Sequence, residues 1–501
     1  MTSAARSYRF GDSAPPGVLL GLPLRQAVPV MAGVVWLAAC LQTPLGVPGG
    51  LAGLVVGVVV AFGRWRGSPL ADTLVPAARI AVAARVGRRT WHRPVLLGAG
   101  GEALPPVLDG LELIEHHRGD TMVSGSTAPG LAVVRDRRRH TLTGALHVVG
   151  RGFPLAAAED QDRMLAGWGA ALSPFARPRS PVVQVAWQAW AGPAEMSEHD
   201  EFLAATAPTY DGATGDGPLL DYLALVDQQA SATRAQRVLV TVTIDQRQVR
   251  RQGHSSRLDA GIEALADELE RFGQRLGAAG LTVDGPLGTS ALTAAIRLRS
   301  DPTRAGQLAT LTRSLAAAAG RGSTEWGPMT VEPDWATVRV DGSWHRTYRV
   351  AGWPQLPVPA DWLGSLLGEP TTTRTVCVVL EPVPITQSAR AADREAMARE
   401  ADADAKGRRG FRITALDRQR LSRVEDRERE LAEGHAEFRF TGLVDIAAPD
   451  PEALEDAAGG VEQAAAQSLI DLRPLDARHD QAWAACLPLG RNLTSRNGGL
   501  R

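Results

Sequence analysis

Lysine is almost absent from the sequence, since Lys406 is the single lysine among 54 lysine and arginine residues. A Walker A loop needs a lysine directly after its second glycine, because the ammonium group must reach the terminal phosphates of a nucleotide. Lys406 lies in the segment DADAKGRRG, which does not have that spacing. The sequence therefore predicts a protein that neither binds nor hydrolyses ATP by itself.

Cysteine is scarce as well, with Cys40, Cys377 and Cys486 far apart in the chain. None of them belongs to a CxxC pair or has a histidine at zinc-binding spacing. Three scattered cysteines indicate free thiols in a reducing compartment. Cys377 and Cys486 lie in apolar runs, which favours a buried packing role over a nucleophilic one.

Catalytic motifs are missing too. The chain has no GxSxG elbow, and GAGGEA at residues 98–103 departs from the dinucleotide fingerprint because Ala103 replaces its last glycine. The formal net charge of -1 argues against nucleic acid as the main partner. We therefore predict that the protein is not an enzyme, with no catalytic, cofactor-binding or metal-binding residues and no sequence-specific contact with nucleic acid.

Two patterns resemble metal sites without completing them. Asp402, Asp404 and Gly407 occupy positions one, three and six of a calcium-binding loop, but Ile413 stands where the bidentate glutamate is required. The neighbouring residues His116 and His117 point to opposite faces if they lie on a strand, so they cannot share a metal. The basic segment RDRRRH at residues 135–140 suits phosphates or acidic lipid, although an exposed strand end is the favoured interpretation.

A long uncharged run occupies the 38 residues between Arg25 and Arg64, broken near its middle by prolines and a Gly-Gly pair. Two spans of about 20 residues would each cross a hydrocarbon layer of about 30 Å. We therefore predict a two-helix transmembrane hairpin at about residues 26–63, in contact with the lipid bilayer. The alternatives are a buried helical pair, which the length of the run disfavours, and a signal peptide, which lacks a cleavage site here.

Arginines flank this run on both sides, and positive flanks belong in the cytoplasm. The prediction is a protein of the cell (inner or plasma) membrane with two spans and with both termini in the cytoplasm. The remainder would form cytoplasmic domains at residues 96–330 and 331–501, after a tail, hairpin and basic linker at residues 1–95.

Strand-like and helix-like periods alternate through these cytoplasmic residues. HTLTGALHVVG, PVVQVAWQAWAG and RVLVTVTID read as strands, and apolar residues spaced three and four apart from Leu258 to Leu276 indicate a helix. A second cycle starts at SWHRTYRVAGW, and about half of the residues from 390 to 433 are charged. The predicted fold class is α+β: duplicated ferredoxin-like units, each a sheet with helices on one face, and a charged helical insertion at about residues 385–434.

The amino-terminal segment YRFGDSAPPGVLLGLPLRQ resembles the PrgI family of small membrane subunits of Gram-positive conjugation machines. The later segments HRTYRVAGWP, TVCVVLEPVP, AEFRFTGLVDIAA and DQAWAACLPLGRN are similar, in this order, to the non-ATPase half of the conjugation ATPases of type IV secretion, the CagE/TrbE/VirB family. In that family a motor domain follows. The resemblance places the family's catalytic residues in that following domain, so none is carried onto this chain. The Ala-rich composition, with arginine in place of lysine, is typical of actinobacterial proteins.

The resemblance implies a non-catalytic, membrane-anchored scaffold of a type IV secretion or conjugation machine. Its partners would be a separate P-loop ATPase and other subunits of the secretion channel. A homo-oligomer of the chain is a further alternative. The interface with the ATPase is expected around Trp483 and Leu487, within residues 479–501. The alternative is a membrane subunit of a type VII (ESX-like) secretion apparatus.

Overall fold

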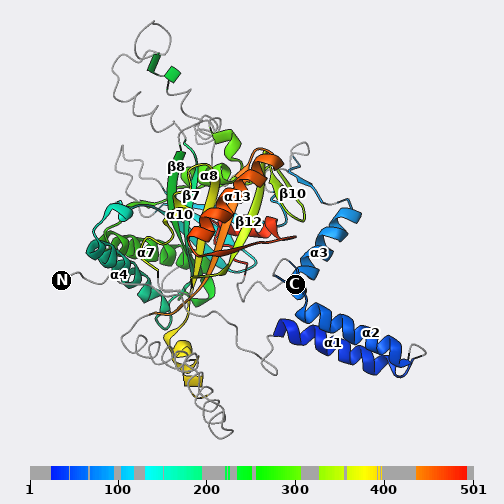
Figure 1. Ribbon diagram of the computed structural model, residues 1–501. Helices are drawn as coiled ribbons and strands as arrows, with labels where there is room; N and C mark the ends of the chain where they lie inside the picture. Colours follow the sequence, from blue (N-terminus) through cyan, green and yellow to red (C-terminus); the bar gives the residue numbers. More distant parts are fainter. Residues whose placement is uncertain are drawn as a thin grey trace, which may run out of the picture.

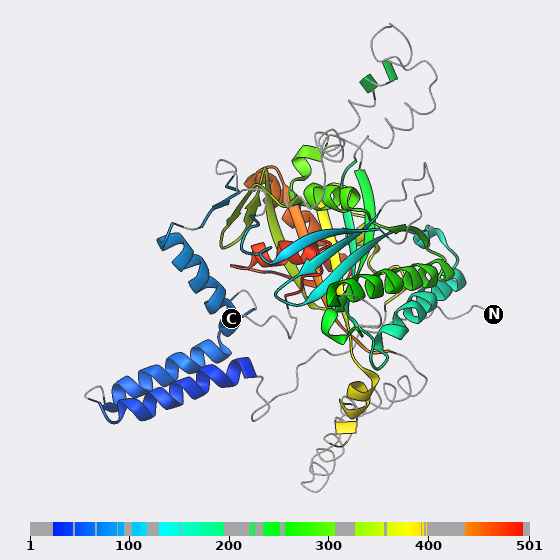
Figure 2. The ribbon, with the colours of Figure 1, turned by 180° about the vertical axis from the view of Figure 1, so that it is seen from behind.

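The computed structural model describes residues 24–43, 46–65, 68–87, 89–94, 103–117, 130–150, 152–194, 221–222, 224–225, 234–250, 256–305, 326–354, 358–391, 393–394, 397 and 436–493. Most of these residues build one antiparallel sheet with helices against both of its faces (Figure 1). The first helices lie apart from the sheet. Figures 1 and 2 both show α1 (Leu24–Cys40) and α2 (Gly46–Phe62) side by side, with α3 (Leu70–Arg85) between this pair and the sheet.

No helix in the described part of the chain is long and apolar enough to cross a membrane. α1 and α2 have 17 residues each. At 1.5 Å per residue such a helix spans about 25 Å, which is less than the hydrocarbon layer of about 30 Å. The predicted transmembrane hairpin is therefore wrong, and so are the membrane-protein class and the location with two spans that followed from it.

The first half of the sheet is a βαββαβ unit. Its strand order is β9-β6-β8-β7 with antiparallel neighbours, which is the ferredoxin-like order. Val and Thr residues fill β8, and Ser256 begins the long helix by accepting a hydrogen bond from the Asp259 N–H. The elements are β6 (Thr141–Val149), α4 (Ala158–Leu172), β7 (Val182–Pro193), β8 (Arg234–Asp245), α7 (Arg257–Ala278) and β9 (Thr282–Pro286).

A second βαββαβ unit follows, with the matching strand order β15-β12-β14-β13. Asp450 caps its main helix by accepting the Ala453 N–H, and Pro451 occupies the first helical position, where no amide hydrogen is required. The elements are β12 (Ser343–Gly352), α10 (Gly364–Leu367), β13 (Thr373–Pro382), β14 (Phe438–Ala448), α13 (Pro451–Gln467) and β15 (Asp471–Pro474).

The two units share one continuous sheet because β7 pairs with β13 in antiparallel register. Further strands extend the sheet at both ends, namely β4 (Leu111–His116) and β5 (Leu131–Asp136) at one end, and β3 (Trp91–His92), β10 (Thr330–Pro333) and β11 (Val338–Val340) at the other. β1 (Arg64–Trp65) and β2 (Ser68–Pro69) form a separate small hairpin. The 3-10 turns are η3 (Phe153–Leu155), η4 (Ser173–Ala176), η5 (Gln246–Gln248) and η6 (Pro302–Arg304).

Alternation along the strands produces two hydrophobic layers. On one face, α4 and α7 pack against the first unit, and α10 and α13 pack against the second. On the other face lie α8 (Thr289–Ser300) and α14 (His479–Cys486), which bury Ile296 and Trp483 against the sheet. The prediction of helices on one face only is therefore wrong, because two helices outside the βαββαβ order cover the second face.

The predicted domain segments 96–330 and 331–501 each supply strands to this sheet, and their boundary falls inside β10. Most of the charged insertion at about residues 385–434 lies outside the described residues. So do Lys406 and the calcium-like segment around Asp402.

Candidate functional site

The basic segment at residues 135–140 lies at the turn between β5 and β6, and carboxylates neutralise its arginines. Arg135 and Arg137 lie 3.4 and 2.9 Å from the Glu112 carboxylate, and Arg138 pairs with Asp109. His116 faces Glu263 at 3.2 Å, while His117 is exposed. Among the described residues no group of three His, Cys, Asp or Glu side chains is arranged to hold a metal ion.

β12 carries the HRTYR motif, and its period of two sends neighbouring side chains to opposite faces of the sheet. Arg346 and Tyr348 point towards α13, where they contact Glu455 and Glu462. His345 and Thr347 point towards α14. One strand therefore contributes to two different polar environments.

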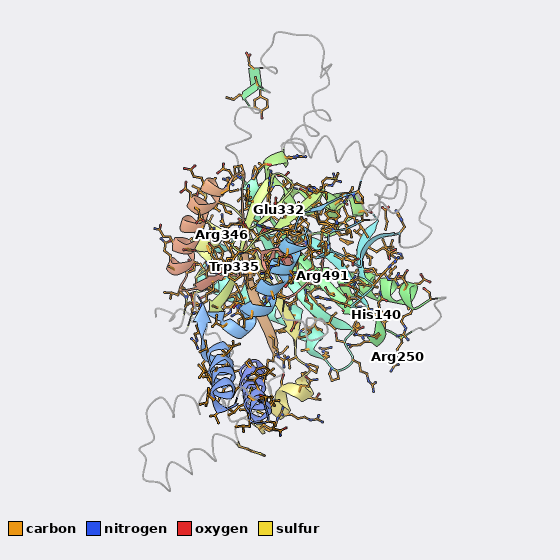
Figure 3. All side chains as sticks on the ribbon, turned by 90° about the vertical axis from the view of Figure 1, so that its right-hand side faces the viewer. His140, Arg250, Glu332, Trp335, Arg346 and Arg491 are labelled. Atoms are coloured by element: carbon orange, nitrogen blue, oxygen red, sulfur yellow. The ribbon has the colours of Figure 1, made fainter. Side chains whose placement is uncertain are left out.

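The α13 side of β12 forms a hollow of about 390 Å³, lined by Ala336, Arg346, Tyr348, Glu455, Glu462, Pro474 and Asp476. Arg346 donates two hydrogen bonds to the Glu455 carboxylate, at 3.0 and 2.5 Å. The Tyr348 hydroxyl donates to Glu462 at 3.0 Å. Figure 3 shows Arg346 beside α13, with Trp335 labelled close to it. We call this site the α13 hollow.

Tyr348 and Arg346 in the α13 hollow both stay protonated near neutral pH. Burial raises the pKa of Tyr348 to about 12, so its phenol stays protonated. The hydrogen bonds to Glu455 raise the pKa of Arg346 above its ordinary value. A neutral phenol and a paired guanidinium are poor bases and nucleophiles. Tyr348 is 1% exposed and Arg346 has 13% of its side chain exposed, so Arg346 is the donor of the two that reaches the surface.

The α14 side of β12 is a fully buried polar network. His345 places Nδ1 2.9 Å from an Asp445 carboxylate oxygen and Nε2 2.9 Å from the Ser300 carbonyl oxygen. Thr347 donates its hydroxyl to Asp445 at 2.8 Å and its backbone N–H to His479 Nδ1 at 3.1 Å. Burial lowers the pKa of His479 to about 3, so that ring is neutral.

Trp483 and Leu487, the expected docking residues, lie inside the protein. Their exposed fractions are 0% and 1%. The Trp483 ring meets the His345 ring edge-on at 6.3 Å between centroids, and the Leu487 carbonyl accepts a hydrogen bond from Gln188. In this conformation neither side chain is available to a partner, so the surface expected around them is not a docking surface.

The backbone of the segment after α14 packs closely against β6 and β8 at Gly490, whose φ is +68°. A Cβ there would collide with the Thr143 hydroxyl and come within 2.7 Å of the Thr243 hydroxyl. We expect Gly490→Ala to lower the free energy of unfolding by about 2–3 kcal/mol, because left-handed strain and overpacking add. Gly152→Ala is the matched control, since Gly152 has φ +63° with nothing within 4 Å of the added Cβ; its expected loss is about 1 kcal/mol. Urea denaturation measures both, and equal losses would contradict the close approach.

A second surface feature is the apolar exterior of the α1 and α2 pair. Large hydrophobic side chains that are half-exposed or more include Val28, Met31, Val35, Trp36, Leu51, Val55, Val56, Val59 and Phe62. Contiguous apolar exposure of this kind marks an interaction site. α3, which leads from this pair to the sheet, is tied to α14 by two hydrogen bonds from Arg79 to Asp480, at 2.8 and 3.0 Å.

No protein-family model and no curated protein matches the chain. The α13 hollow was missed by reasoning from the sequence, because its lining residues come from four separated segments. The signal available was the alternation in HRTYR, which places an arginine and a tyrosine on one face.

Proposed function

We propose that the chain is a non-catalytic assembly subunit of a conjugation-type secretion machine, and that it binds a separately encoded P-loop ATPase through the α13 hollow. The observation that carries the proposal is the position of the segments that resemble the conjugation ATPase family. They form β12, β13, β14 and α14, which are adjacent in one structural unit, and the α13 hollow opens beside the first of them.

The chemistry of the hollow supports binding. Arginine is one of the residue types enriched at the energetic centres of protein interfaces. Here Arg346 is preset by Glu455, so little of its side-chain entropy remains to be lost on binding. Tyr348 is 1% exposed, and its hydroxyl holds Glu462 at the rim of the hollow. A volume of about 390 Å³ accepts one or two partner side chains, and the acidic rim favours basic ones.

The apolar exterior of α1 and α2 provides a separate contact with another subunit of the machine. Because this pair lies apart from the sheet (Figures 1 and 2), both contacts can be occupied at once. The subunit then links the ATPase to the rest of the machine.

The test reverses one charge at the rim of the hollow. Glu455 has 67% of its side chain exposed, so Glu455→Lys should leave the core intact, while it repels a basic partner and releases Arg346 from its preset position. Tagged chain is purified from its native cells, and co-purifying P-loop proteins are quantified by mass spectrometry. We expect Glu455→Lys to reduce recovery of the ATPase at least about tenfold, the effect of roughly 1.4 kcal/mol at an interface.

Asp456→Lys is the matched control, because Asp456 is exposed on the same helix but does not line the hollow. Its recovery of ATPase should equal that of the unaltered chain. Equal losses in both variants would place docking elsewhere, and absence of any P-loop protein would refute the proposal. The type of ATPase recovered also separates a conjugation-type machine from a type VII apparatus.

A further inference from the structure

Two cysteines that are 109 positions apart in the sequence meet under α14. Cys377 lies on β13 and Cys486 is the last residue of α14. Their exposed fractions are 0% and 2%, and both belong to one small apolar cluster. The Cys377 Sγ lies 3.8 Å from the carbonyl oxygen of Ala485, the residue directly before Cys486.

We propose that Cys377 and Cys486 are a redox modification site, a dithiol that low-molecular-weight disulfides convert to an intramolecular disulfide. A disulfide requires the two sulfur atoms to approach to about 2 Å from neighbouring backbone positions. Cys377 already contacts the residue that precedes Cys486, and both cysteines pack in the same apolar cluster, so the two side chains start from neighbouring backbone positions. Cys40, on α1, belongs to the helix pair that lies apart from the sheet.

The reaction balances with an oxidised glutathione-type disulfide as the oxidant. The Cys377 thiolate attacks one sulfur of the oxidant, forms a mixed disulfide and releases one small thiolate. The Cys486 thiol gives its proton to that thiolate and attacks the Cys377 sulfur, which forms the internal bond and releases the second small thiolate. Two cysteine thiols are oxidised, and one small disulfide is reduced to two thiols.

Access to the thiols requires α14 to move. Both sulfur atoms are buried, and burial raises the pKa of the Cys486 thiol, so direct attack from solvent is slow. α14 has eight residues, and local opening of such an element exposes Cys486 transiently. The product joins β13 to α14 and restricts later opening of the carboxy-terminal part of the protein.

The experiment incubates the purified full chain with excess oxidised glutathione at pH 8. The protein is then unfolded and alkylated without reduction, and its intact mass and peptides are determined. We expect one alkylated cysteine, Cys40, and one peptide pair joined through Cys377 and Cys486. The oxidised protein should melt roughly 5 °C higher, because the bond closes a loop of more than 100 residues.

Variants decide between this site and incidental oxidation. Cys40→Ala should leave the internal bond unchanged, and Cys486→Ala should abolish it while melting within a few degrees of the unaltered chain. Alkylation of both Cys377 and Cys486 after full equilibration would overturn the proposal, as would a stable mixed disulfide or a bond between two copies of the chain.

Discussion

Replacing Trp483 by alanine is expected to lower the free energy of unfolding by about 3–5 kcal/mol, the range for deleting a fully buried large aromatic side chain. Trp483 has no exposed surface and packs in the same cluster as residues of α8, β5 and β8. It also stacks edge-on against His345, so its removal opens the buried polar network. Urea denaturation followed by circular dichroism gives the change directly.

Trp335→Ala is the control for this experiment, since the Trp335 side chain is 37% exposed. The backbone carbonyl oxygen of Trp335 accepts a hydrogen bond from the Ala477 N–H. The substitution leaves this hydrogen bond in place. A loss of about 1 kcal/mol or less is expected. Comparable losses for the two tryptophans would contradict the buried position of α14.

Because α14 is buried, deletion of residues 479–501 is not a suitable test of ATPase docking. The deletion would remove Trp483 and Leu487 from the core, so a loss of ATPase binding could result from unfolding of the chain. Substitutions at the rim of the α13 hollow avoid this problem because they leave the core intact.

Local elements were predictable from the sequence where one periodicity dominates. The apolar spacing from Leu258 to Leu276 predicted the helix observed as α7, whose buried residues include Ile262, Leu265, Leu269 and Phe272. The strands predicted at 140–150, 181–192 and 237–245 are confirmed as β6, β7 and β8. In each case the residues that set the period are the residues that pack.

Long-range features were not predictable in this way. The uncharged run from residue 26 to 63 led to the wrong prediction of two spans, because hydrophobicity does not determine where a helix ends; α1 ends at Cys40 and α2 begins at Gly46. Likewise, nothing local in Val185 and Leu380 reveals that β7 pairs with β13. The α13 hollow and the cysteine pair both depend on such pairings, so they emerge only from the folded chain.

The second large effect concerns the buried pair of His345 and Asp445. Both ring nitrogens of His345 face oxygen atoms, and the Ser300 carbonyl can only accept a hydrogen bond. The geometry therefore favours the doubly protonated imidazolium, which donates to both oxygen atoms. Burial opposes this charge, but the Asp445 charge and the two hydrogen bonds outweigh it, and the pKa of His345 is raised above 6.5.

Removing one partner of this pair leaves the other buried and unpaired. We therefore expect Asp445→Ala to lower the free energy of unfolding by about 3–5 kcal/mol at pH 6. Asp284→Ala is the matched control, because Asp284 pairs with His147 at 2.6 Å but has 53% of its side chain exposed. An exposed pair contributes about 1 kcal/mol or less.

The same pair gives stability a pH dependence of known sign. Because the folded pKa of His345 lies above its unfolded value of about 6.5, its contribution is complete below that pH and is lost as pH rises through the folded pKa. His479, whose pKa is lowered to about 3, acts in the opposite direction, and its effect fades above about pH 7.5, where the unfolded histidine has lost its proton. Unfolding free energies measured above about pH 7.5 therefore report on His345 and not on His479. We expect them to fall with pH, by at most about 1.4 kcal/mol per pH unit. Asp445→Asn should flatten this profile, since an amide satisfies a neutral ring without a charge; an unchanged slope in that variant would show that another group titrates.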